Sequence, residues 1–135
     1  MIGAYKKFDK GNHKANDKPA KDLVIKFLRS KGLDAEENPN DYGVDVMVGR
    51  YEVERRSIWV NKFPFNTVHI PSRKTKFLKY NIIYAVVNKN FNKIMLCPSS
   101  TIIKYKQIEV PNKSVKSGEF FYDVPIEEWS IYEVN

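Results

Sequence analysis

Cysteine is almost missing from this chain of 135 residues, in which Cys97 is the single example. One cysteine excludes an intramolecular disulfide and any metal site assembled from several cysteine thiolates. Its place in the apolar run Ile94-Met95-Leu96-Cys97 favours a small buried hydrophobe over a nucleophile. We therefore expect a protein that works in a reducing, intracellular (cytoplasmic) setting.

Long apolar runs are missing as well, and acidic residues are scarce relative to basic ones. No segment approaches the length of a membrane span, and the N-terminus is charged from Lys6 onward without a signal-peptide core. The 23 basic and 16 acidic residues give a net charge of +7 and a pI near 9.4. This balance favours a polyanionic partner, either nucleic acid or, as the alternative, an anionic membrane surface. We expect nucleic acid and no membrane.

The chain does contain enough apolar residues, 42%, for the core of one ordinary domain. We predict a basic N-terminal arm over residues 1–17 and a single domain over residues 18–135. Asp17 and Pro19 are helix start signals, and Gly32 is a stop signal. Between them an apolar stripe repeats at helical spacing, formed by Leu23, Val24, Phe27 and Leu28.

The rest of the chain favours strands. Residues 81–87 form the most apolar run and predict a central strand buried on both faces, with residues 93–97 as its antiparallel or adjacent partner. Residues 68–70 predict a short strand, residues 101–105 a short helix and residues 110–118 a polar loop. The expected architecture is an N-terminal helix packed on a central mixed sheet, of α/β or α+β class.

Residues 43–56 read as two short strands joined by a tight turn at Gly49-Arg50. An apolar row contains Val44, Val46, Val48, Tyr51 and Val53. The opposite row holds Asp45, Glu52, Glu54 and Arg56. The turn predicts Val48 opposite Tyr51 and Asp45 opposite Glu54. Three carboxylates on one hairpin repel each other unless a cation lies among them, so Asp45, Glu52 and Glu54 are candidate metal ligands; an ordinary charged, solvated face is the alternative.

Together with the preceding helix, Gly43-Val44-Asp45 and Glu52-Val53-Glu54 resemble the PD-(D/E)XK nuclease superfamily, in particular its small Holliday-junction-resolvase-like branch. The resemblance covers about Lys18 to Asn88. It implies a restriction-endonuclease-like fold and a Mg²⁺-dependent (or Mn²⁺-dependent) nuclease that cuts DNA or RNA, with Asp45 as the first acid. It also implies intracellular action, compatible with a phage-encoded enzyme, and a homodimer, since relatives that cut two strands are often dimers.

Two registers compete for the (D/E)XK pair. In the first, Glu52-Val53-Glu54 is the pair, and Glu54 stands where lysine is usual. In the second, Glu54-Arg55-Arg56 is the pair, and Arg56 keeps the charge but cannot act as a general base. The alternation favours the first register. Since the usual lysine is absent, we expect Arg73 or Lys74 to approach the carboxylates or the scissile phosphate, and Lys74 is predicted as catalytic with the three acids.

The remaining basic residues predict contacts with nucleic-acid backbone: Arg56, Arg73, Lys76, Lys79, Lys14 and Lys18. His69 points opposite to Val68 and Ile70, as a surface histidine or a proton carrier. The aromatic residues of the following loop either stack on bases or bury a sheet edge: Trp59, Phe63 and Phe65. Without the usual lysine, the same fold also suits a catalytically inactive module that binds nucleic acid or a protein.

Overall fold

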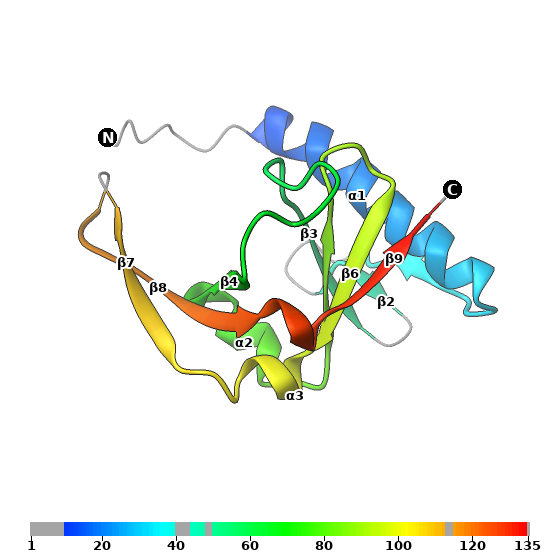
Figure 1. The fold of residues 1–135 in the computed structure, drawn as a ribbon. Coiled ribbons are helices and arrows are strands. Elements are labelled where there is room, and N and C mark those ends of the chain that lie inside the picture. Colours follow the sequence, from blue (N-terminus) through cyan, green and yellow to red (C-terminus); the bar gives the residue numbers. More distant parts are fainter. Residues whose placement is uncertain (1–9, 40–43, 48–49, 113–114, 135) are drawn as a thin grey trace.

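The computed structural model of the chain describes residues 10–39, 44–47, 50–112 and 115–134. In this part of the chain one long helix, α1 (Lys10–Ser30), and two β-sheets form the body of the molecule (Figure 1). Short helical turns connect the strands: η1 (Ser72–Lys74), α2 (Thr75–Leu78), α3 (Ser99–Ile102) and η2 (Ile126–Glu128). The predicted helix at residues 101–105 thus begins two residues earlier than expected.

Helix α1 ends as the sequence predicted and begins earlier. Gly32 has φ +86°, and the amides of Gly32 and Leu33 donate to the carbonyls of Arg29 and Leu28, which closes the helix with a left-handed cap. The predicted start at Asp17 is wrong, because the helix begins at Lys10 and Pro19 lies inside it. Residues 10–17 are polar and carry no apolar stripe, so the periodicity gave no sign of these first turns. No helix in the described ranges is long and apolar enough to cross a membrane.

The larger sheet is mixed, as predicted. Among the described residues of this sheet, β3 and β5 pair in parallel, and the other neighbouring strands pair antiparallel. Its six strands lie in the order β1 (Glu36–Glu37), β2 (Val46–Met47), β3 (Tyr51–Arg55), β5 (Ile83–Val87), β6 (Lys93–Pro98) and β9 (Ser130–Glu133). The central position of β5 and its antiparallel pairing with β6 confirm the predictions for residues 81–87 and 93–97.

Each face of this sheet has its own apolar core. Helix α1 covers one face, where its stripe packs against Tyr51 and Val53 of β3. Tyr84 and Val86 of β5 face the other way, into a second core that includes Trp59. Because β3 and β5 are covered on both sides, alternate residues of one strand enter two different environments. The fold is therefore α+β, with a helix on one side of a mixed sheet and a second layer on the other.

The second layer is a three-stranded sheet in the order β4 (Thr67–Pro71), β8 (Val115–Pro125) and β7 (Gln107–Asn112). Strand β4 confirms the strand predicted at residues 68–70. The polar loop predicted at residues 110–118 is wrong, since β7 and β8 form a long hairpin that projects at the left of Figure 1. The pairing shifts between Val110 and Asn112, next to Pro111, and this irregularity hid the strand from a simple alternation rule.

Candidate active site

The hairpin that the sequence singled out exists, with a register two residues from the predicted one. Val46 of β2, and not Val48, lies opposite Tyr51 of β3. The predicted turn residue Gly49 lies outside the described residues, and Arg50 has φ +53°. The predicted single apolar row is also wrong: Val46 enters the core under α1, whereas Val44 packs against the core on the other face. The chain bends at Asp45 between them, so strict alternation stops there.

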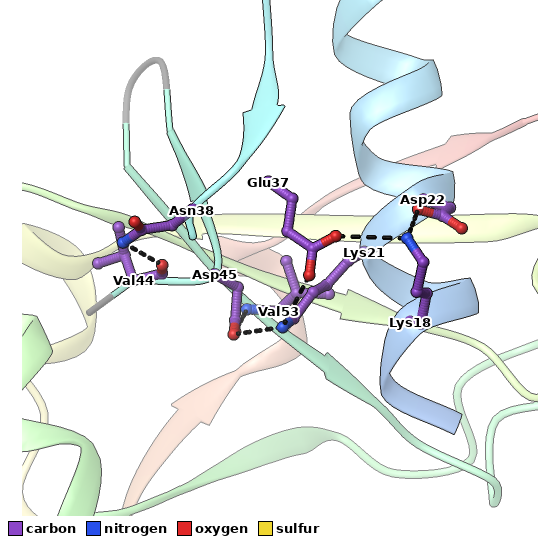
Figure 2. Close-up of polar contacts among 8 residues, drawn as sticks. All are labelled: Lys18, Lys21, Asp22, Glu37, Asn38, Val44, Asp45 and Val53. Atoms are coloured by element: carbon purple, nitrogen blue, oxygen red, sulfur yellow. Dashed lines mark hydrogen bonds and ion pairs between the residues drawn. The ribbon is translucent and has the colours of Figure 1, made fainter. Parts of the chain in front are cut away.

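Asp45 occupies that bend and is held by both backbone and side chain. Its Oδ2 accepts a hydrogen bond of 2.8 Å from the amide of Val53, and its Oδ1 lies 3.4 Å from the Nζ of Lys21 on α1 (Figure 2). Lys21 Nζ also lies 3.7 Å from an Oε of Glu37. Asp45 is thus fixed between the middle of β3 and the helix, with its side chain four-fifths buried.

Lys21 begins a chain of alternating charges that runs outward along α1. Oε1 of Glu37 on β1 lies 3.3 Å from the Nζ of Lys18. The same Nζ lies 3.1 Å from Oδ1 of Asp22, one turn further along α1 (Figure 2). The pKa of Lys18 is raised from its usual value, first by the hydrogen bond to Asp22 and then by that to Glu37. Lys18, predicted to contact nucleic acid, therefore already has two carboxylate neighbours.

Glu52 is the buried acid of the site. Its side chain is 5% exposed, and its Oε2 lies 2.6 Å from the Nζ of Lys74. Burial and, after it, the neighbouring carboxylate of Asp45 raise the pKa of Glu52, Lys74 lowers it, and the net result is a pKa of about 7. The other oxygen, Oε1, is buried without a hydrogen-bond partner among the described residues. Asp45, Glu52 and Lys74 therefore form a compact group of two acids and one ammonium.

Glu54 lies two residues along the same face and has partners of its own. Its Oε2 accepts a hydrogen bond of 2.5 Å from the Nε of Arg56, and its Oε1 accepts one of 2.5 Å from the hydroxyl of Tyr84. Arg56 also donates to the carbonyl of His69. Burial, followed by the charge of Glu54, raises the pKa of Tyr84 well above its usual value. The two oxygens of Glu54 thus serve a second polar group centred on Arg56.

The described residues contain no group of three or more histidine, cysteine, aspartate or glutamate side chains placed to hold one metal ion together. Of the three acids predicted as metal ligands, Asp45 and Glu52 lie next to each other, whereas Glu54 is hydrogen-bonded to Arg56. Of the two basic residues expected to approach the carboxylates, Lys74 reaches Glu52, and Arg73 is exposed.

The other predicted nucleic-acid contacts lie around this group or beyond the described part. Lys76 and Lys79 are exposed on and after α2, close in sequence to Lys74, and Lys76 Nζ lies 5.0 Å from the ring centre of Phe77. Lys14 lies in α1, but its side chain is outside the described part of the chain. His69 does point opposite to the buried Val68 and Ile70.

Lys21 belongs to this group but was not among the residues that the sequence singled out. Its side chain is 16% exposed and reaches Asp45. The signal was present: Lys21 lies three and seven residues before Val24 and Leu28, which places all three on one stripe of the helix. A lysine on an apolar stripe indicates an acidic partner in the layer below.

Comparison of the sequence with known families finds no matching family, and comparison with curated proteins finds no match either. Comparison of the structure with solved structures finds the Holliday junction resolvase Hjc of the archaeal hyperthermophile Archaeoglobus fulgidus. The identity is 13%, the match covers 89% of this chain and 94% of that one, and the TM-score is 0.45.

Proposed function

We propose that this protein is a metal-dependent nuclease that hydrolyses phosphodiester bonds in nucleic acid, DNA being the favoured substrate. The observation that supports it most is the group of two adjacent carboxylates, Asp45 and Glu52, with the ammonium of Lys74 at 2.6 Å from Glu52. Acids of this kind are costly to bury unless a cation offsets their repulsion. The proposal includes the restriction-endonuclease-like fold and the Glu52-Val53-Glu54 register, with Lys74 taking the position left open by Glu54.

The residues present fit a divalent metal ion. One buried oxygen of Glu52 has no hydrogen-bond partner within the described part of the chain. The pKa of Glu52, about 7, is raised by burial and by the nearby Asp45, and a bound cation would favour the charged carboxylate against both effects. Mg²⁺ commonly uses one or two carboxylates and completes its shell with water and phosphate oxygens, and Mn²⁺ accepts similar oxygen ligands. Asp45 and Glu52 would hold the ion, which would supply a more acidic bound water and offset charge on the phosphate.

The chain's own residues have distinct tasks in this proposal. Asp45 is kept in place by the Val53 amide and by Lys21, so its position does not depend on the ligand. The Lys74 ammonium lies at the rim of the same group, 21% exposed, where it can contact a phosphate oxygen and stabilise negative charge that develops during cleavage. Glu54 orients Arg56 and, through Tyr84, links the site to the central strand β5.

The wider surface supports a nucleic-acid partner. Arg73, Lys76 and Lys79 are exposed on the segment that carries Lys74, so backbone phosphates bound there would lie beside the acid pair. The net charge of +7 adds a sequence-independent attraction. Lys14 and Lys18 on α1 remain proposed contacts at the periphery. A homodimer, which would cut both strands of a duplex, and an intracellular setting complete the proposal.

A cleavage screen tests the proposed function. Single-stranded, duplex and four-way-junction DNA, and RNA of the same sequences, would be incubated with the protein in Mg²⁺, Mn²⁺ or EDTA. We expect metal-dependent cuts, and a loss of well over a hundredfold in Asp45→Ala, since even changes next to a metal ligand cost about 10–100-fold. Wild-type protein that cuts none of these substrates in either metal contradicts the proposal.

One observation favours a second candidate, a non-catalytic module that binds nucleic acid. Lys74 lies 2.6 Å from Glu52 and Lys21 lies 3.4 Å from Asp45, so each acid of the pair already has a protein cation. For this candidate we expect salt-sensitive binding that Asp45→Ala leaves unchanged, and no heat of metal binding in calorimetry. Metal-dependent cleavage by the wild type excludes it.

A further inference from the structure

A hollow of about 210 Å³ lies at Arg56, the partner of Glu54, between the loop that follows β3 and strand β4. Its walls are Arg56, Phe63, Phe65, Thr67 and His69. Phe65 is 57% exposed, whereas the neighbouring Phe63 is 6% exposed and belongs to the core. The Phe65 ring therefore keeps a large exposed apolar surface at the hollow, which a flat ligand could cover.

The aromatic walls are held in place by the rings behind them. Phe65 meets Phe63 edge to face, with ring centres 5.9 Å apart and planes at 75°, and Phe63 meets the buried Trp59 in the same way at 6.0 Å and 81°. On the other side, His69 Nε2 lies 3.2 Å from Asp123, and its ring lies 5.5 Å from that of Phe121 at 31°. These contacts give two flat surfaces that need little ordering when a ligand enters.

Arg56, whose side chain is 21% exposed, forms a polar wall of the hollow. Its Nε donates to Glu54 and its Nη2 to the carbonyl of His69. Among the described residues it has no further hydrogen-bond partner, so Nη1 can donate to a ligand in the hollow. Glu54 therefore fixes a planar cation against an aromatic cleft.

We propose that this hollow binds one unpaired nucleobase of the nucleic-acid substrate, stacked on Phe65 and His69 and contacted by Arg56. Every base has a flat face that stacks on aromatic rings, and base carbonyls and ring nitrogens accept hydrogen bonds from guanidinium groups. The volume is below the range of about 300–1,000 Å³ usual for sites that enclose larger ligands, and it suits a single planar ring system.

This inference rests on the proposed function and names its substrate class. Glu52, Glu54 and Arg56 follow one another on one face of β3 and just beyond it, so Arg56 lies about 13 Å from Glu52 along the strand direction. A base held at Arg56 and a phosphate held at Lys74 would therefore belong to nearby nucleotides of one strand. The site would favour nucleic acid with unpaired bases over a fully paired duplex, in which the bases are stacked on each other.

Binding to fluorescent oligonucleotides tests the inference without any need for cleavage. The probes are a single strand, a duplex with one unpaired 2-aminopurine and the same duplex fully paired, all in EDTA. We expect wild type to prefer the first two and to quench the 2-aminopurine. Phe65→Ala should weaken binding of those two by about ten- to hundredfold and abolish the quenching, with little effect on the paired duplex. Phe65→Trp should retain both properties.

The matched control is Phe120→Ala, which removes an equally large aromatic side chain that is 48% exposed on β8, next in sequence to Phe121. It should leave all three affinities unchanged. Equal affinity of wild type and Phe65→Ala for the single strand, or an equal loss on all three probes, overturns the inference. If Phe65→Ala loses affinity for unpaired bases but the wild type does not cleave in metal, the inference is supported and the nuclease activity is contradicted. If the wild type cleaves but Phe65→Ala has no effect on binding, the nuclease activity is supported and the inference is overturned.

Discussion

Strand β3 has two faces that are buried to a similar degree and have opposite chemistry. Tyr51 and Val53 pack under α1 with exposures of 6% and 4%, in a core of apolar side chains. Glu52, between them in sequence, is equally buried at 4% but faces the layer of β4 and η1. The first face follows from the hydrophobic effect alone. The second places ionisable groups where their charged forms are penalised.

The difference indicates which part of the molecule serves stability and which serves function. A buried carboxylate beside another carboxylate does not improve the fold, because desolvation and repulsion both oppose its ionised form. The raised pKa of Glu52 expresses that cost. The α1 face should therefore respond to mutation mainly through stability, and the opposite face mainly through activity and ion binding. Four predictions test this division.

The largest effect is expected on activity at the polar face. Lys74→Ala should lower the rate of metal-dependent cleavage by about 10²–10³-fold, the scale of losing one group that stabilises developing charge. Stability should change little, because a buried Glu52 without its ammonium can take up a proton. Steady-state cleavage and thermal unfolding measure the two effects. Lys76→Ala, which removes an exposed lysine two residues away, is the control and should cost less than tenfold. Equal losses in the two variants contradict a special role for Lys74.

On the α1 face the large effect is on stability. Leu28 is 2% exposed in the core under the helix, and Leu28→Ala should lower the free energy of unfolding by about 3 kcal/mol. Cleavage per folded molecule should stay within about twofold of wild type. Urea unfolding together with activity corrected for the folded fraction separates these quantities. A loss of specific activity as large as that of Lys74→Ala would remove the proposed division between the two faces.

Glu52 links the polar face to pH. Because its pKa is raised from 4.5 to about 7 in the folded protein, the folded state binds more protons than the unfolded state between these values. Its contribution to stability is therefore fully present below about pH 4.5 and is lost as the pH rises through about 7, by about 3 kcal/mol. Glu52→Gln should remove this decline and be at least as stable as wild type at pH 8. Parallel stability curves for the two proteins from pH 5 to 8 would show that the shift is absent.

The smallest effect is expected at Lys21. Lys21→Ala removes the ion pairs to Asp45 and Glu37 and should cost about 1 kcal/mol of stability. The same change should strengthen metal binding, because Lys21 competes with a cation for Asp45. Calorimetric titration with Mn²⁺ measures this. Lys26→Ala, an exposed lysine on the same helix, should change neither quantity. Weaker metal binding in Lys21→Ala contradicts competition and indicates that Lys21 only positions Asp45.

The sequence predicted the elements that depend on local patterns. The apolar stripe of α1, the left-handed stop at Gly32 and the doubly buried strand at residues 83–87 all follow from periodicity or from glycine's conformational freedom. The start of α1 and the β7–β8 hairpin were missed because polar helical turns and an irregular strand pair carry no regular apolar signal.

The sequence predicted which residues form the candidate site better than it predicted how they are arranged in space. Asp45, Glu52 and Lys74 were singled out as residues, but the hairpin register was two residues off, and this error placed Glu54 opposite Asp45. A register depends on the loop and on what covers each face, neither of which is local. Lys21 was missed for the same reason, since its partner is 24 residues away.

Calorimetric titration of Mn²⁺ and Mg²⁺ into wild type, Asp45→Asn and Glu52→Gln at pH 8 tests the central claim most directly, namely that the Asp45–Glu52 pair is a cation site. We predict saturable binding by the wild type and a loss of more than tenfold in affinity in both variants, each of which should remain folded. Wild-type protein that binds neither metal, or variants that bind as tightly as wild type, would contradict the account.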